Sequence, residues 1–257
     1  MKKIFLRVVA ICLAFFMYIP IMQVYGQELH WYCKRNKEHK QPTSDPQFSF
    51  LDECGGIYVD KAHGDDNEEK VIYLTFDVGY ENGNVSKILD VMKEENVVGS
   101  FFILGNVVKR NPELVLRMAN EGHIVCNHTL NHPNLVGKSE ESFKNEVLGL
   151  ENEYRRLTGK EMSKFFRPPQ GTFDCEMLER AQALGYKTVF WSFAYADWDN
   201  DKQMDEDVAL KKILDNIHNG EIMLIHPTSA TNAKIMKKLI RELKEQGYNF
   251  ATLDKIK

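Results

Sequence analysis

Short runs of apolar residues alternate with longer amphipathic segments over the C-terminal two thirds of the chain. Seven runs have the length and composition of buried β-strands, at residues 71–76, 98–103, 124–126, 165–166, 187–191, 221–225 and 248–251. A strand followed by a helix, repeated along the chain, predicts an α/β fold with a parallel sheet, and seven such units fit a closed or nearly closed barrel. A doubly wound open sheet is the alternative interpretation.

Several segments between these runs carry helix signals, namely a proline or a capping side chain at the start and a glycine at the end. The predicted helices occupy residues 112–121, 177–184, 208–217 and 232–246. In parallel α/β folds, the loops after the carboxyl ends of the strands converge on one face of the molecule. Functional residues are therefore expected in those loops.

Two segments precede this repeat. Residues 27–69 are polar and keep neither the helical nor the strand period for long, so they are predicted to form an N-terminal arm wrapped on a domain at 70–257. Residues 1–26 combine three basic residues with an apolar run at 8–19, then Pro20 and Gly26, which is typical of a secretory signal peptide. The run is shorter than the roughly 20 apolar residues of a spanning helix, and an uncleaved anchor tilted through Met22 is the alternative.

Composition and charge fit an exported globular protein. The chain has 257 residues, 43% of them hydrophobic and 27% charged, and a chain of this length buries roughly 70–75% of its unfolded surface. Its net charge is −4, and removing the three basic residues of the signal leaves 30 basic against 37 acidic residues, or −7. This charge does not attract nucleic acid. The expected location is secreted or in the cell envelope, with membrane contact only if the anchor is retained.

Four of the five cysteines lie outside the predicted signal, which contains Cys12. Their spacing matches neither a zinc ribbon nor a redox pair. Cys33 and Cys54 both lie in the N-terminal arm and could form a disulfide in an oxidising compartment. Cys126 and Cys175 fall in periodic segments, where small buried side chains are expected.

Five polar residues with catalytic or ligand chemistry follow five of the predicted strands. Asp77 ends the first strand and His128 follows the third. Arg167 ends the fourth strand, Asp197 follows the fifth, and His226 ends the sixth. Because these loops converge in a parallel barrel, the five side chains are expected around one mouth.

His128 and His132 lie four positions apart in a loop. Such a pair is common without a metal, but in a loop the two imidazoles can converge on an ion, typically zinc with nitrogens about 2.0–2.1 Å away. Asp77 could simply cap a turn. However, Gly79 and Gly83 leave room for close backbone approach, and a carboxylate at the end of a barrel strand is placed for general-base work.

Three further residues suit supporting or acid roles. Arg167 could hold a carboxylate such as Asp77 ionised through a charge-assisted pair, or be a surface residue before a stiff turn. Asp197 could orient an imidazole and raise its pKa, which suits His226 as a general acid. The alternative for His226 is a buried histidine satisfied by the backbone. The apolar strand before it, which includes Leu224, would line a pocket floor.

Five ordered motifs, at residues 75–79, 127–132, 167–171, 197–198 and 224–226, resemble those of the polysaccharide deacetylases of carbohydrate esterase family 4. The resemblance covers about residues 70–255. It implies a distorted (β/α)7 barrel and a hydrolase that removes acetyl groups from N-acetylated sugars. By position, it implies Asp77 as catalytic base, His226 as acid, Arg167 and Asp197 as their partners, and His128 and His132 as metal ligands.

Two positions depart from the family pattern. The family usually has a second aspartate as metal ligand where this chain has Val78, and a tyrosine where it has Gln170. Valine cannot bind a metal ion. The expected cofactor is therefore a weakly held divalent ion, zinc first, with cobalt or manganese as alternatives. The family also suggests a backbone N–H near Gln170 for the oxyanion.

The loops at residues 79–83 and 226–233 resemble one branch of the family, the muramic δ-lactam-forming de-N-acetylases, whose members also lack the second aspartate. This resemblance implies N-acetylmuramic acid residues of peptidoglycan as substrate, a spore-cortex role, and an amidase that first removes the stem peptides. The residues expected to contact the substrate are Tyr80, Asn82, Gln170, Trp198 and Leu224.

Two rival interpretations differ in substrate or in class. One keeps the chemistry and changes the substrate to N-acetylglucosamine polymers, either in peptidoglycan or in chitin. The other is a non-catalytic module that binds cell-wall glycan, for which Val78 is the main argument. The catalytic candidates Asp77, Arg167, Asp197 and His226 are all present, which favours an enzyme over a binding module.

Overall fold

The computed structural model describes residues 27–256, so the predicted signal peptide at residues 1–26 lies outside the described residues. All seven predicted strands are present within this range. They are β5 (Val71–Val78), β6 (Ser100–Ile103), β7 (Ile124–Asn127), β8 (Phe165–Phe166), β10 (Lys187–Val189), β11 (Glu221–Ile225) and β12 (Asn249–Phe250).

The strands form a curved parallel sheet. Its order is β11-β5-β6-β7-β8-β10-β4, where β4 is Gly56–Ile57, and β12 pairs with the first two residues of β5. Isolated bridges join Val59 to Glu221 and Phe193 to Met223, which link one edge of the sheet to β11 at the other. The sheet is therefore a distorted, nearly closed barrel, which confirms the predicted fold class over a doubly wound open sheet.

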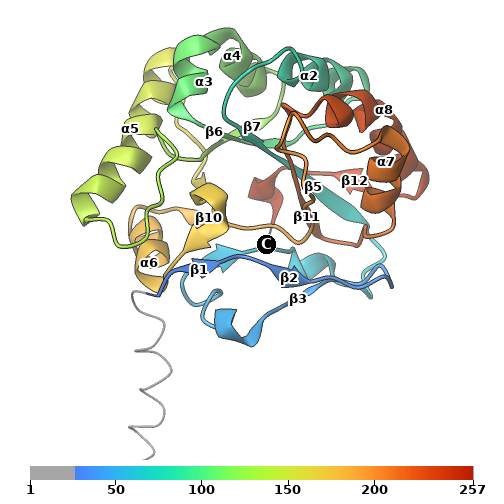
Figure 1. Cartoon of the computed structure of the whole chain (residues 1–257), viewed down its shortest axis with the longest axis horizontal. Helices are drawn as coiled ribbons and strands as arrows, with labels where there is room; N and C mark the ends of the chain where they lie inside the picture. The colour runs from blue at the N-terminus through green and yellow to red at the C-terminus, as the bar shows by residue number, and fades with distance from the viewer. Residues whose placement is uncertain (1–26, 257) are drawn as a thin grey trace, which may run out of the picture.

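Helices cover the outside of this barrel (Figure 1). They are α2 (Val85–Glu94), α3 (Gly105–Arg110), α4 (Pro112–Asn120), α5 (Glu140–Thr158), α6 (Cys175–Ala183), α7 (Glu206–Leu214) and α8 (Ala230–Glu245). Helix α8 begins before the predicted Asn232 because the Ser229 hydroxyl caps it by accepting from the Asn232 N–H. Within residues 27–256, no helix combines the length and apolar character needed to cross a bilayer.

The predicted N-terminal arm, residues 27–69, contributes strands to the fold. Its segments are β1 (Leu29–His30), β2 (Cys33–Lys34), β3 (Thr43–Ser44), β4, and the 3-10 turns at Pro46–Phe48 and Lys61–His63. Strand β4 completes the barrel sheet beside β10, and β1 pairs with β9 (Thr172–Phe173). The arm, blue in Figure 1, runs along one side of the barrel. Its strands have two residues each, too few to show a period in the sequence.

Aromatic side chains attach the arm to the barrel. The Trp31 ring stacks on Phe190 with 4.8 Å between centroids, and Phe48 packs on Phe173 at 5.5 Å. The Trp31 indole N–H donates to the Trp191 carbonyl at 2.8 Å. These contacts bury the apolar residues of a segment that is polar on average.

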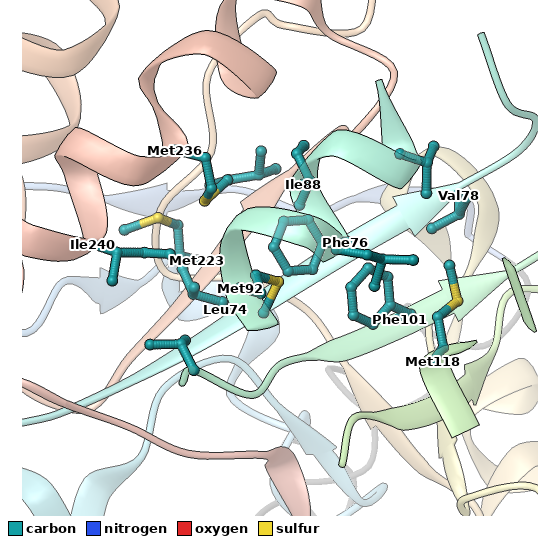
Figure 2. Close-up of a cluster of buried hydrophobic side chains, with 14 of the residues drawn as sticks. Leu74, Phe76, Val78, Ile88, Met92, Phe101, Met118, Met223, Met236 and Ile240 are labelled. Atoms are coloured by element: carbon teal, nitrogen blue, oxygen red, sulfur yellow. The ribbon is translucent and has the colours of Figure 1, made fainter. Parts of the chain in front are cut away.

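Strand β5 divides its side chains between two environments. Leu74, Phe76 and Val78 are buried in the core between the sheet and the helices, with Ile88 of α2 and Met236 of α8 (Figure 2). Successive side chains of a strand point to opposite faces, so Thr75 and Asp77 face the barrel interior. The apolar face packs the strand against the helices, and the interior face can carry polar functional side chains.

The cysteines are arranged differently from the predicted pairing. The Cys33 thiol donates to the Ser192 carbonyl at 3.2 Å, whereas the Cys54 Sγ lies 3.1 Å from the Sγ of Cys175. The structure therefore brings Cys54 to Cys175 instead of Cys33. Cys126 is buried, as predicted.

Candidate active site

The carboxylate of Asp77 is fixed by a buried arginine at the end of β5. Arg167, which follows β8 and is completely buried, donates from Nη1 to Asp77 Oδ1 at 2.7 Å. Its Nη2 donates to the Thr75 hydroxyl at 2.9 Å and its Nε to the Val189 carbonyl at 3.1 Å. The guanidinium also lies 4.1 Å from the centre of the Phe102 ring. With its donors occupied, Arg167 holds the carboxylate in one orientation.

The charges around Asp77 keep it ionised. Burial raises the pKa of this carboxyl, but the charge and hydrogen bond of Arg167 and the electrostatic contributions of the His128 and His226 imidazoles together outweigh burial, and the net result is a lowered pKa. An ionised carboxylate at the mouth of the barrel can accept a proton.

His128 follows β7 and has a defined tautomer. Its Nδ1 lies 2.8 Å from the Arg167 carbonyl oxygen, which can only accept, so Nδ1 carries the proton. The lone pair is then on Nε2, which lies 3.6 Å from Asp77 Oδ2. Burial lowers the His128 pKa to about 4, which keeps the ring neutral. A neutral imidazole with an oriented lone pair is suited to bind a metal ion.

His132 faces His128 across the same loop, with 5.0 Å between the ring centroids. Burial also lowers its pKa. Thr129 and His132 both have left-handed backbones, with φ of 76° and 61°, which is uncommon for residues other than glycine. The Thr129 hydroxyl accepts from the His132 N–H at 2.9 Å and stabilises this conformation. Such strained backbone is concentrated at functional sites.

A second charged pair lies across the cavity from Asp77. His226 Nδ1 is 2.7 Å from Asp197 Oδ1, and the His226 backbone N–H donates to Asp197 Oδ2 at 2.8 Å. Burial lowers the pKa of His226, but the hydrogen bond and charge of Asp197 outweigh it, and the net result is a raised pKa. The Asp–His pair therefore favours a protonated imidazole.

Asn232, in the first turn of α8, supports this pair. Its Nδ2 donates to Asp197 Oδ2 at 2.7 Å and to the His226 carbonyl at 3.1 Å. The hydroxyl of Tyr195 in turn donates to the amide oxygen of Asn232. The sequence marks Asn232 only as a helix start, so no signal identifies it as part of the site.

These side chains surround one cavity of about 650 Å³. Trp198 and Tyr80 lie at its rim with 60% and 42% of their surface exposed. Fifteen residues line it: Asp77, Gly79, Tyr80, Leu104, His128, His132, Gln170, Gly171, Trp191, Ala194, Tyr195, Trp198, Leu224, His226 and Thr228. The lining thus includes four of the residues predicted to contact the substrate, Tyr80, Gln170, Trp198 and Leu224.

Three predicted residues are placed behind the cavity or outside it. Arg167 and Asp197 are buried behind their partners. Asn82 is not among the lining residues, and its amide donates to the Thr228 carbonyl at 2.8 Å. Sequence reasoning missed Leu104, Trp191, Tyr195 and Thr228, since apolar and hydroxyl side chains in loops carry no distinctive pattern.

The residues available for a metal ion are the two imidazoles with the adjacent Asp77 carboxylate. Nitrogen and oxygen donors of this kind suit zinc and neighbouring divalent ions. Val78 is completely buried in the core and faces away from the cavity. Among the described residues, one set of three ligand-type groups lies within 4.8 Å, and it is Cys54, Cys175 and Glu179, away from this cavity.

The mouth of this parallel barrel thus holds a carboxylate with a lowered pKa and an imidazole with a raised pKa, a pair suited to general acid–base catalysis. The family described as polysaccharide deacetylase matches residues 64–189.

Relatives extend this match over most of the chain. The peptidoglycan-N-acetylmuramic acid deacetylase PdaA of Bacillus subtilis is 38% identical over 89% of this chain and 86% of its own length. The structure of B. subtilis PdaA, a family 4 carbohydrate esterase, superposes with a TM-score of 0.85 at 37% identity, covering 91% of this chain and 98% of that one. A peptidoglycan-N-acetylglucosamine deacetylase of Bacillus cereus is 33% identical over 86% of this chain and 80% of its own. The chain belongs to the polysaccharide deacetylases of carbohydrate esterase family 4, and it is a hydrolase.

Proposed function

We propose that the protein removes the N-acetyl group from N-acetylmuramic acid residues of peptidoglycan, a step that leads to muramic δ-lactam. The observation that carries this proposal is the Asp77–Arg167 pair and the His226–Asp197 pair on one cavity. The similarity over most of the chain to a relative named peptidoglycan-N-acetylmuramic acid deacetylase supports the choice of sugar.

Two proton transfers are needed to hydrolyse an acetamide. Asp77 accepts the proton of the attacking water, because Arg167 holds its carboxylate ionised. His226 donates a proton to the departing amine nitrogen, because Asp197 raises the pKa of the imidazole and so favours its protonated form. The backbone N–H of Gln170, a residue of the cavity wall, stabilises the oxyanion of the tetrahedral intermediate.

His128 and His132 hold a divalent ion in this proposal, zinc in the first place, with cobalt or manganese as alternatives. When bound, such an ion would polarise the acetamide carbonyl and would lower the pKa of a bound water. Hydrogen bonding to the Arg167 carbonyl keeps the His128 Nε2 free of a proton for this role. Because Val78 supplies no second carboxylate ligand beside Asp77, the ion would be held weakly.

Aromatic side chains at the rim select a sugar. Trp198 and Tyr80 present exposed rings, which can pack against the apolar face of a pyranose. Leu224 and Trp191 form apolar parts of the lining deeper in the cavity.

Mass spectrometry of glycan strands tests the substrate. Strands with and without stem peptides are incubated with the protein, and the expected product is bare muramic acid that has lost one acetyl group and one water. Asp77→Asn serves as the inactive control. Release of acetate only from N-acetylglucosamine residues would instead assign deacetylation of that sugar, the activity named for the B. cereus relative. Glycan binding that persists in Asp77→Asn, without acetate release by the parent protein, would assign a non-catalytic binding module.

Metal titration tests the cofactor. A chelated sample is supplied with zinc, cobalt or manganese while acetate release is followed, and activity should return with a half-saturating concentration well above that of a tightly held zinc site. His128→Ala and His132→Ala should each remove the response. Activity that is indifferent to chelation would contradict the metal role.

The location and biological role follow from the substrate and from the resemblance to the lactam-forming branch. The protein acts outside the cytoplasm, after export by the signal at residues 1–26, and depends on an amidase that removes stem peptides. A spore-cortex role stays a prediction. A strain without the gene should produce spores whose cortex lacks muramic δ-lactam, and a cortex with unchanged lactam would contradict this role.

A further inference from the structure

Two buried cysteines meet where the arm joins the barrel. Cys54 lies in the turn before β4, and Cys175 is the first residue of α6. They are 121 residues apart in the sequence, yet their Sγ atoms are 3.1 Å apart. Only 7% of Cys54 and 6% of Cys175 is exposed. The two sulfur atoms face one another across the seam between the arm and the rest of the molecule.

We propose that Cys54 and Cys175 form a disulfide in the exported protein, which ties residues 27–69 covalently to the barrel. Disulfides form and persist in oxidising extracytoplasmic compartments. The inference rests on the proposed location, and it does not depend on which sugar the enzyme deacetylates.

The chemistry converts two thiols into one S–S bond, with the release of two protons and two electrons. A protein disulfide of the extracytoplasmic space accepts the electron pair and is cleaved to a dithiol, which takes up the two protons. Cys175 begins a nine-residue helix, whose dipole favours a thiolate at this end, whereas the nearby Glu179 carboxylate opposes it. Burial raises the pKa of the Cys54 thiol, so the bond is expected to form during folding, before the pair is covered.

The alternative to a disulfide is a metal ion bound by Cys54, Cys175 and Glu179. Glu179 lies one turn further along α6, with Oε1 3.8 Å from the Sγ of Cys175. Two thiolates on one tetrahedral zinc, each about 2.3 Å from the ion, lie roughly 3.7 Å apart, farther than the 3.1 Å seen here. A structural zinc site also uses four protein ligands, and the described residues offer three at this cluster. A disulfide needs no further ligand, only that the two sulfurs close from 3.1 Å to about 2.05 Å, and it is therefore the simpler chemistry for this pair.

The bond would act on the cavity through the arm. Trp31 donates its indole N–H to the Trp191 carbonyl and stacks on Phe190. Trp191 lines the cavity, and the Phe190 carbonyl accepts from Arg167 at 3.2 Å. A covalent tie at Cys54 thus keeps the arm seated behind the residues that position Asp77.

Peptide mapping tests the bond directly. The full chain is purified from the exported fraction without reductant, alkylated after unfolding, and digested. The expected result is one linked peptide pair that joins Cys54 to Cys175, with Cys33 and Cys126 alkylated. Alkylation of both Cys54 and Cys175, or a bond that includes Cys33, would overturn the proposal. This readout involves no activity, so it is independent of the proposed function.

Thermal unfolding measures the effect of the bond. Reductant should lower the Tm of the parent protein by roughly 5–15 °C, as is usual when a long loop is released. The Cys54→Ala/Cys175→Ala double variant should show no response to reductant, and Cys33→Ala, the matched control in the arm, should keep the full response. One zinc per chain that is retained in His128→Ala/His132→Ala but lost in the double cysteine variant would overturn the disulfide in favour of a structural metal site.

Discussion

Charged neighbours shift the pKa values of the two residues proposed to transfer protons. Arg167, together with His128 and His226, lowers the pKa of Asp77 against the effect of burial, whereas Asp197, together with Asp77, raises the pKa of His226 against it. Two titratable groups pushed in opposite directions are the usual sign of an acid and a base that work together. The arrangement depends on buried partners that do not touch the cavity.

Asn232 should act as a positioning residue for His226. In Asn232→Ala, Asp197 loses a hydrogen bond of 2.7 Å, so kcat should fall roughly 10- to 100-fold, the cost of one hydrogen bond to a charged group, while KM stays near that of the parent. Asn84→Ala is the matched control, since Asn84 also donates to a loop carbonyl, that of Thr228, at 2.9 Å. Equal losses of kcat in the two variants would contradict the positioning role.

The alkaline limb of the pH profile should report His226. As general acid it must be protonated, so activity falls as the pH rises through its raised pKa. Asp197→Asn removes the charge that raises this pKa and should move the limb to lower pH. A raised histidine pKa also stabilises the fold below the unfolded value of about 6.5, and this stabilisation is lost as the pH rises through the folded pKa. The pH profile of kcat/KM for both proteins checks the shift, and an unmoved limb contradicts it.

At the scale of the elements, the loop that carries the two histidines is held between α3 and α5. The Gly105 N–H donates to the Leu130 carbonyl at 3.1 Å, and the Leu130 N–H donates to the Glu146 carbonyl at 3.1 Å. His128 and His132 flank Leu130 in the sequence. The positions of the two histidines therefore depend on how Leu130 packs between α3 and α5.

Two glycines that contact Leu130 should respond in opposite ways to alanine. A Cβ at Gly105 would lie 2.5 Å from Leu130 Cδ1 and 2.8 Å from its carbonyl oxygen, so Gly105→Ala must displace the loop and should reduce activity at least 10-fold. A Cβ at Gly149, within α5, meets only the end of the Leu130 side chain at 3.2 Å. Gly149→Ala should keep activity and gain about 0.5–1 kcal/mol of stability. Activity assays and thermal unfolding of both variants check this, and full activity in Gly105→Ala contradicts it.

The sequence predicted the strands of the barrel better than its helices. Each strand from β5 onward is a compact apolar run between turn residues, a strong local signal. Helices α2, α3 and α5 had no predicted counterpart. Helix α2 follows Asn84, which makes no side-chain cap, and its first N–H groups are satisfied instead by the Glu81 carboxylate. Strand β4 depends on its pairing with β10, which lies more than a hundred residues away and leaves no local trace.

At the scale of the whole molecule, the predicted site residues lie together because the loops that follow the parallel strands meet at one end of the barrel. Residues far apart in the sequence are thereby brought close in space. Asp77, Arg167, Asp197 and His226 could be grouped from the sequence, since each follows a recognisable strand. The partner residues that complete the site could not be identified from the sequence. Asn232 contributes through a hydrogen bond from its side-chain amide to Asp197, and Trp191 through contacts with the arm, and both depend on tertiary packing.

A buried neutral histidine should make the fold sensitive to acid. Burial lowers the pKa of His123 to about 4, and its Nδ1 accepts from the Gly99 N–H at 3.1 Å. The unfolded chain binds this proton near pH 6.5, so stability is full above that pH and is lost as the pH falls toward 4. The loss from this residue should be about 2–3 kcal/mol between pH 7 and 4.5. Denaturant unfolding at both pH values measures it. His123→Asn, whose amide oxygen can replace Nδ1, should reduce the slope, and an unchanged slope contradicts the assignment.

Restoring the aspartate that the family usually has should not restore a metal ligand. The side chain of residue 78 is buried among Phe76, Ile103 and the helix side chains, so Val78→Asp places a carboxylate in the apolar core. Stability should fall by about 3–5 kcal/mol, the cost of an unpaired buried charge, against about 1–3 kcal/mol for the Val78→Ala control. Zinc affinity should not rise. Calorimetric zinc titration and denaturant unfolding check both statements, and tighter zinc binding in Val78→Asp would contradict them.

The straight course of β5 through residue 78 gives this strand an odd–even rule. While Val78 stays paired with Ile103, odd positions of β5 face the barrel interior and even positions face the helices, so adjacent residues cannot share one task. A substitution in this strand can therefore add a functional group to the barrel interior only at every second position, unless the pairing with β6 ends one residue earlier. Whether the side chain of residue 78 can reach the cavity then depends on where the strand ends, and therefore on the backbone as well as on the identity of the side chain.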